Sequence, residues 1–333
     1  MKKWLMIPAI LILIAIIVFI FVKIRTVEDI EIPDTAGQIV NVSPEEFQTP
    51  RVVADSGSPA STLKGVTNIL VCGVDNYDAD SMEERGNSDG IMLLTLNADT
   101  KEFILTSFMR DSKVKVNDYK RDKLTHVYHD DGLEALISVL ESNFEISVDY
   151  YAIFNFLDVA DIVDSVGGVE INLAEEEIYS LEPKIRNVCS MKNVAYEDYK
   201  LTKADAGKRI VNGIQAAAYA RIRPEYGHYD VGRTERCRTI VYEVLKKVSE
   251  MSMQEMLPFA DVFLKKTNNN ISDELLMSIV NGAEEIKSYK LISDRIPIDG
   301  AYQSQNDGNG SYIIPDFEIN NKHLKDSIYK GIH

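Results

Sequence analysis

Two carboxylates and one arginine stand where apolar segments of the chain end or begin. Asp75 follows the first apolar segment, Asp89 precedes the second after a polar loop of thirteen residues, and Arg110 follows the third. If these segments pair as antiparallel strands, the three side chains meet at one edge of a sheet. Paired carboxylates beside a basic group can hold Mg²⁺, which prefers oxygen ligands and often keeps substrate phosphates in its shell. Asp is also common in turns after strands, so a structural role is the alternative.

A basic stretch lies in the second half of an acidic chain. Residues 203–247 contain ten Lys or Arg and five Asp or Glu, whereas the formal charge of the whole chain is −16. This total argues against nucleic-acid binding through the whole surface. Arginines in the first turns of a helix are unfavourable unless an anion lies near them, and arginine suits bidentate contacts to phosphate oxygens. The stretch therefore indicates a pyrophosphate site, with a surface patch paired to acidic groups as the alternative. Its arginines are Arg221, Arg223, Arg233, Arg236 and Arg238.

The elements that must position these groups are visible as apolar patterns. Continuous runs rich in β-branched residues predict buried strands at residues 66–74, 91–96 and 103–109, with a turn at 97–101 that makes the last two a hairpin. A helix containing Leu133 and Phe144 precedes a strand at residues 148–156. A short helix near 158–166, a Gly167-Gly168 turn and a strand at 169–173 follow.

The second half is mainly helical. Helices are predicted at residues 214–220, 231–248, 253–266 and 273–288, with Asp230 and Ser272 as N-caps of the second and the fourth. From residue 290 the chain is expected to return to the sheet and to finish in a helix at 321–329. This mixture predicts one α/β domain with a mixed sheet.

The first residues predict a membrane anchor. Residues 4–22 carry no charge, and a helix of that length spans about 28 Å, close to the thickness of a bilayer core. A cleaved signal peptide is the alternative, but the apolar run ends in bulky residues. We expect a cytoplasmic stub (1–3), a transmembrane anchor (4–22), an extracytoplasmic stalk (23–65) and a catalytic domain (66–333). Basic residues flank the anchor on both sides, so charge does not fix its orientation.

The three cysteines lack the spacing of a zinc site. Cys72 lies inside an apolar run and is expected to be buried and inert. Cys237 stands one helical turn after Arg233, so it should face the candidate site. Cys189 lies in the polar stretch 184–203, where apolar packing is a poor explanation for a cysteine. Either a disulfide joins Cys189 to Cys237, or Cys237 is a thiol at the site.

Several motifs in order resemble the LytR-CpsA-Psr family of bacterial envelope proteins. They span about residues 67–248 and read NILVCGVD, NSDGIMLLTLN, SFMRDS, VDSVGGVEI, NGIQAAAYARIR and DVGRTERCR. The resemblance implies an extracytoplasmic phosphotransferase of the cell membrane that moves a phosphate-linked glycopolymer from a polyprenyl pyrophosphate carrier to peptidoglycan. It also implies a mixed sheet flanked by helices on both faces, with an apolar groove for the polyprenyl tail.

The resemblance assigns roles to individual residues. Asp75 and Asp89 match the Mg²⁺-associated aspartates, Asp230 matches an aspartate near the reacting centre, and four arginines match pyrophosphate-binding positions: Arg110, Arg221, Arg223 and Arg233. The chain has Asn87 where the family often has Arg, so Arg85 is a displaced counterpart, and Cys237 stands where the family usually has Gln. A polyprenyl pyrophosphate hydrolase and a non-catalytic polyprenyl-phosphate-binding regulator are the alternative functions.

Overall fold

The computed structural model describes most of the chain after residue 64. The described residues are 65–75, 86–118, 120–222, 229–251, 253–272, 274, 275, 278, 289–306 and 311–331. The predicted stub, anchor and nearly all of the stalk lie outside these ranges, as does most of the helix predicted at 273–288. Within the described ranges, no helix is long and apolar enough to cross a membrane.

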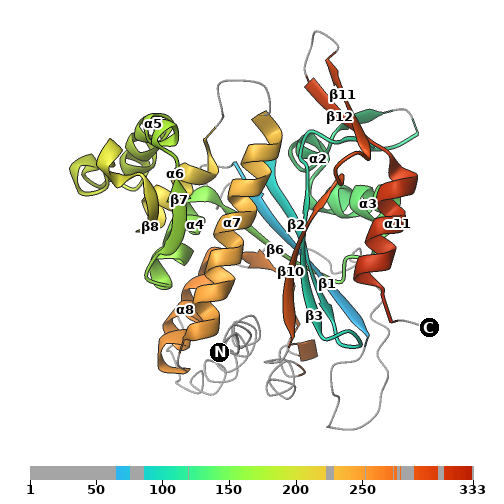
Figure 1. The fold of residues 1–333 in the computed structure, drawn as a ribbon. Helices are drawn as coiled ribbons and strands as arrows, with labels where there is room; N and C mark the ends of the chain where they lie inside the picture. Colours follow the sequence, from blue (N-terminus) through green and yellow to red (C-terminus); the bar gives the residue numbers. More distant parts are fainter. Residues whose placement is uncertain are drawn as a thin grey trace, which may run out of the picture.

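A mixed sheet of six strands forms the centre of the molecule, in the order β10-β3-β2-β1-β6-β9 (Figure 1). The strands β1, β2 and β3 form an antiparallel meander, β6 runs parallel to β1, and β10 runs parallel to β3. The predicted strands and the return of the tail to the sheet are thereby confirmed. The bounds are β1 Val66–Val74, β2 Ser88–Asn97, β3 Glu102–Phe108, β6 Tyr150–Asn155, β9 Asn268–Asn269 and β10 Lys290–Ile296.

Side chains alternate between the two faces of the sheet, because successive residues of a strand point in opposite directions. In β1, Ile69 belongs to the core on one face, whereas Leu70 and Cys72 belong to the core on the other. Helices cover both faces, as predicted. In Figure 1, α4, α6, α7 and α8 lie on one side of the sheet, and α2, α3 and α11 on the other. The bounds are α2 Leu124–Asp131, α3 Leu133–Phe144, α4 Phe156–Ser165, α6 Gly213–Ala220, α7 Tyr229–Glu250, α8 Met253–Lys266 and α11 Phe317–Ile328.

The two predicted N-caps have different outcomes. The backbone N–H of Leu275 donates to Ser272 Oγ at 3.2 Å, so Ser272 caps the next helix as expected. The helix α7 begins at Tyr229, one residue before Asp230. Asp230 therefore lies in the first turn, and its prediction as an N-cap is wrong.

A smaller unit stands beside α6 and was only partly anticipated. The predicted strand at 169–173 exists as β7 (Val169–Leu173), but it pairs with β8 (Gly207–Val211) in a separate two-stranded sheet. Between these strands runs α5 (Glu175–Met191), followed by two short 3₁₀ turns, Tyr196–Asp198 and Lys203–Asp205.

Two short hairpins complete the described fold, and both lie on the α2 side of the sheet (Figure 1). The first joins β4 (Lys113–Lys115) to β5 (Arg121–Lys123), and the second joins β11 (Tyr302–Asn306) to β12 (Ser311–Pro315). Neither hairpin was predicted, because β4 and β5 have only three residues each, β11 is polar, and the apolar residues of β12 are too few to show a period.

Candidate active site

The sheet brings the two predicted aspartates to one edge. In the pairing of β1 with β2, Gly73 faces Gly90 and Val74 faces Ser88, so Asp75 and Asp89 extend from the same end of the two strands. The N–H of Asp75 donates to the carbonyl of Asn87 at 2.9 Å, which continues the pairing past the bulge. We call Asp75, Asp89, Arg110 and Arg221 the rim.

Arg110 reaches the rim from the end of β3. Its guanidinium forms a hydrogen-bonded ion pair with Asp89, and the two side chains are only 17% and 10% exposed. The start of α2 holds this pair in position: Thr125 N–H donates to the carbonyl of Arg110 at 2.9 Å, and Ser88 Oγ donates to the carbonyl of Thr125 at 3.2 Å. The predicted meeting of Asp75, Asp89 and Arg110 is confirmed.

Arg221 completes the rim from the C-cap of α6. One Nη lies 3.9 Å from Asp75 Oδ1, and the other donates to Asn187 Oδ1 at 2.7 Å. The guanidinium carbon lies 4.1 Å from the centroid of the Phe156 ring, which is within the range of a cation–π contact. Asn187 and Phe156 were missed from the sequence, since one lies on the unpredicted helix α5 and the other resembles an ordinary core aromatic.

The donor set at the rim fits a divalent cation that shares its shell with a substrate. Asp75 Oδ1 is buried and accepts no hydrogen bond from any residue that the structure describes. A second carboxylate, Asp89, stands on the paired strand, and no cluster of three His, Cys, Asp or Glu was found in the described ranges. Mg²⁺ commonly binds through one or two carboxylates, with waters and phosphates filling the other positions. Asp75 and Asp89 match that pattern.

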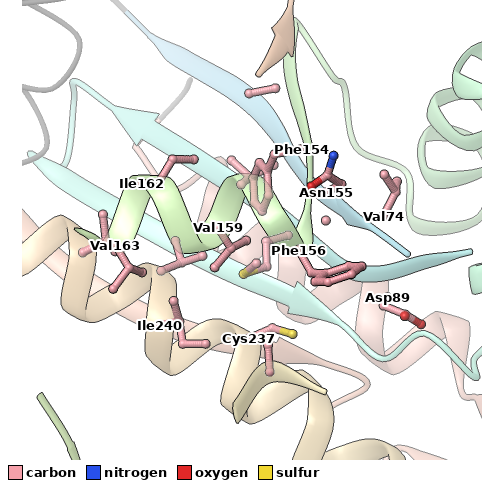
Figure 2. Close-up of a pocket in the computed structure, with 18 of the residues that line it drawn as sticks. Val74, Asp89, Phe154, Asn155, Phe156, Val159, Ile162, Val163, Cys237 and Ile240 are labelled. Atoms are coloured by element: carbon pink, nitrogen blue, oxygen red, sulfur yellow. The ribbon is translucent and has the colours of Figure 1, made fainter. Parts of the chain in front are cut away.

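An apolar cavity opens directly at the rim (Figure 2). It encloses about 150 Å³ and lies between the sheet and the helices α4, α7 and α8. Figure 2 shows Asp89 at one end, with Phe156 and Val159 of α4 on one wall and Cys237 and Ile240 of α7 on the other. Along β1 and the residue after it, the lining runs from Ile69 to Asp75, which is six residue steps or roughly 20 Å. The predicted apolar groove beside the rim is thereby confirmed.

Two paired glycines keep the cavity open next to the carboxylates. A Cβ on Gly73 would lie 3.4 Å from the Phe154 ring, and a Cβ on Gly90 would lie 3.6 Å from Cys237 Cβ. Both distances are ordinary van der Waals contacts, so the fold could accept these methyl groups, but they would occupy the passage between the rim and the interior. We call Gly73, Gly90 and Cys237 the neck.

The other predicted arginines divide into two groups. Arg236 pairs with Glu177 at 2.8 Å, and Arg238 donates to the carbonyl of Asp294 at 3.2 Å. Their charges at the start of α7 are thus met by protein groups, which corrects the expectation that an anion must balance them. Arg85 and Arg223 lie outside the described residues, and for Asp230 and Arg233 only the backbone of α7 is described.

The cysteines show how the polar stretch around 189 was misread. Cys189 is 2% exposed and packs into the core from α5, so the expectation that apolar packing does not explain it is wrong. Cys237 lines the cavity on α7, as predicted, and no disulfide joins the three described cysteines. The predicted Cys189–Cys237 bridge is therefore wrong. Cys72 is fully buried, as predicted, and burial raises the pKa of its thiol to about 12.

Three comparisons with known proteins converge. The family model described as the LytR_cpsA_psr family matches residues 36–327. The polyisoprenyl-teichoic acid–peptidoglycan teichoic acid transferase TagU of Bacillus subtilis (strain 168) is 28% identical over 272 residues, which cover 79% of this chain and 78% of that protein.

Solved structures share the fold at lower sequence identity. One, described as "TagT bound to LI-WTA", is 20% identical with a TM-score of 0.59 and covers 80% of this chain and 91% of its own. Another, described as "LytR-CPS2A-psr family protein YwtF (TagT) with bound octaprenyl pyrophosphate lipid", is 19% identical with a TM-score of 0.55 and the same coverage.

Proposed function

Because the chain belongs to the LytR-CpsA-Psr family, we propose that it transfers a phosphate-linked glycopolymer from a polyprenyl pyrophosphate carrier to peptidoglycan. The observation that carries this proposal is the opening of an apolar cavity at a rim of two carboxylates and two arginines. A lipid pyrophosphate likewise consists of an apolar tail and a charged head group. The names of the relatives support the proposal: TagU is a teichoic acid transferase, and a structural neighbour holds octaprenyl pyrophosphate.

The tail of the donor binds in the cavity, and its burial supplies most of the binding free energy. Each buried methylene contributes about 0.8 kcal/mol, so a few isoprene units suffice for stable binding. The pyrophosphate then lies at the rim, where Arg110 and Arg221 face it from two different elements. Both guanidiniums are already oriented, Arg110 by Asp89 and Arg221 by Asn187, so little rotamer entropy is lost on binding.

Asp75 and Asp89 would hold Mg²⁺ together with the pyrophosphate. When bound, the ion would neutralise charge that builds up on the phosphate oxygens. The Oδ1 atom of Asp75 supports this assignment. It is buried but accepts no hydrogen bond from a described residue, whereas a buried carboxylate oxygen normally has a hydrogen-bond partner.

The reaction is an in-line displacement at phosphorus. A sugar hydroxyl of peptidoglycan attacks the phosphorus nearer the glycan, a new P–O bond forms, and the bond to the bridging oxygen breaks, so that polyprenyl monophosphate leaves. The proton of the hydroxyl passes to a carboxylate, for which Asp89 of the rim and Asp230 of α7 are the candidates. Arg110 and Arg221 stabilise the charge on the equatorial oxygens, and no covalent enzyme intermediate is required.

We further propose that residues 4–22 anchor the protein in the cell membrane with residues 66–333 outside the cell. The carrier lipid and the polymer acceptor meet only at that outer surface. The nineteen uncharged residues of the anchor support this arrangement.

The test is to incubate the full-length protein with a defined lipid-linked glycan, peptidoglycan fragments and Mg²⁺, and to identify the products. Transfer yields a glycan joined to peptidoglycan through a phosphodiester, together with polyprenyl monophosphate. Asp75→Asn should lower the rate by orders of magnitude, whereas Asp99→Asn, at the opposite end of the β2–β3 hairpin, should not. Release of glycan phosphate without coupling would identify a hydrolase, and binding without turnover would identify a regulator.

A further inference from the structure

A second cluster of positive charge lies beside the rim, on the face of the sheet away from the cavity. Lys113 of β4 and Lys123 of β5 place their ammonium groups 4.8 and 5.2 Å from the centroid of the Tyr312 ring of β12. Lys123 also pairs with Asp111 at 2.9 Å. Lys113 makes no ion pair with any described residue, and within the described ranges its ammonium group faces the Tyr312 ring.

The strand β11, which pairs with β12, adds two side-chain amide groups to this cluster. Gln305 is the cross-strand partner of Tyr312, and Gln303 is the partner of Ile314, so both glutamines share the face of the hairpin on which Tyr312 lies. Both glutamines are exposed. We call Lys113, Lys123, Gln303, Gln305 and Tyr312 the hairpin surface.

The hairpin surface is joined directly to the segment that follows Arg110 of the rim. The N–H of Ile313 donates to the carbonyl of Asp111 at 3.0 Å, and Ser112 forms a parallel bridge with Ile313. Lys113 follows Arg110 by three residues, which limits the separation of their α-carbons to about 10 Å. In Figure 1 the hairpin β11–β12 and α2 stand on the opposite side of the sheet from α7. The cavity and the hairpin surface therefore flank the rim from opposite sides.

We propose that the hairpin surface binds the peptidoglycan acceptor, a proposal that rests on the proposed function. In an in-line displacement the attacking and leaving oxygens lie on opposite sides of the phosphorus. The leaving oxygen belongs to the lipid whose tail occupies the cavity, so the attacking hydroxyl must arrive from the far side, where the hairpin surface lies. Its chemistry also fits: the amides match the acetamido and hydroxyl groups of the glycan, and Lys113 matches the carboxylates of the stem peptides.

The proposal is tested with Lys113→Gln in the full-length protein, and with Lys115→Gln as the matched control. Lys115 lies on the same strand, but it is paired with Asp118 at 2.8 Å. Binding of soluble peptidoglycan fragments is measured without donor lipid, and the KM for these fragments is measured with it. We expect Lys113→Gln to weaken binding and raise the KM by about tenfold at low salt, with a smaller effect at high salt, while Lys115→Gln leaves both unchanged. Gln305→Ala should raise the acceptor KM severalfold without altering the salt dependence.

The affinity for the lipid-linked donor is measured for the same proteins. It should not change, because the hairpin surface lies across the rim from the cavity. Equal acceptor binding by wild type and Lys113→Gln would overturn the inference, and so would a loss confined to donor binding, which would assign the surface to the glycan of the donor. If fragment binding depends on Lys113 but the wild-type protein transfers no glycan to the fragments, the proposed function fails and the proposed acceptor surface remains supported.

Discussion

A double substitution at the neck should lower the affinity for the lipid without lowering the stability of the protein. The double variant Gly73→Ala/Gly90→Ala adds two methyl groups that point into the passage beside Asp89, on cross-strand partners. The structure accommodates both, since the nearest atoms would lie at 3.4 and 3.6 Å. Replacing glycine by alanine at compatible backbone angles also lowers the entropy of the unfolded chain, which stabilises a protein by about 0.4–1 kcal/mol per site. The variant should therefore be at least as stable as the wild type.

Its affinity for a polyprenyl pyrophosphate should nevertheless fall. If each methyl group displaces one methylene of the tail, two methylenes lose about 0.8 kcal/mol each. The total of about 1.6 kcal/mol corresponds to binding that is about fifteenfold weaker. Binding is measured by calorimetry with a short-chain prenyl pyrophosphate, and stability by denaturation in urea.

The matched control is Ile91→Val, which removes a methylene from the next residue of β2 on the opposite face of the sheet. It should cost about 0.5–1.5 kcal/mol of stability and leave lipid affinity unchanged. If the alanine variant binds the lipid as tightly as wild type at undiminished stability, the tail does not pass through the neck, and the placement of the donor is refuted.

Three further predictions concern the rim, the cavity wall and the thiols. Arg221→Ala should weaken prenyl pyrophosphate binding about tenfold to a hundredfold, more at low salt than at high salt, and Arg221→Lys should recover only part of it in the same titration. Burial alone would raise the pKa of Asp161 on α4, but hydrogen bonds from Lys192 and Lys266 outweigh it and hold that pKa below its usual value. Asp161→Asn should thus cost about 1 kcal/mol of stability at neutral pH, a difference that disappears as the pH falls below the ordinary Asp value near 3.9, as unfolding at several pH values would reveal. Alkylation of Cys237 should slow when the cavity is filled with lipid, and Cys72 should react only in the unfolded protein, which mass spectrometry of labelled peptides would establish.

The strands and the meeting of three rim residues could be predicted because their patterns are local. Continuous apolar runs identify β1, β2 and β3, and an antiparallel meander brings their polar ends to one edge whatever surrounds them. The proximity of Arg110 to the two aspartates could therefore be predicted from the order of the segments alone.

What could not be predicted depends on long-range pairing. Arg236 meets Glu177 because the fold brings the first turn of α5 to α7, and no element was predicted between residues 173 and 214. The burial of Cys189 could not be predicted for the same reason. Tyr312 and Lys113 lie about 200 residues apart in sequence, and two weakly patterned hairpins bring them together. Such contacts leave no periodic signal in either segment.

The close approach of α6 to α4 ties the position of Arg221 to a residue at the far end of its helix. A Cβ on Gly213, the first residue of α6, would lie 1.9 Å from the carbonyl oxygen of Ala160, where ordinary contact begins near 3.4 Å. Any side chain there must push the helix outward by about 1.5 Å, the difference between the two distances. The eight residues of α6 form a helix about 12 Å long, and Arg221 follows its last residue. A shift at the start of this rigid helix therefore moves Arg221. A displacement of 1 Å at a reacting group can cost about a hundredfold in rate. Gly213 lines neither the cavity nor the rim, but its lack of a side chain fixes the position of α6 and therefore of Arg221.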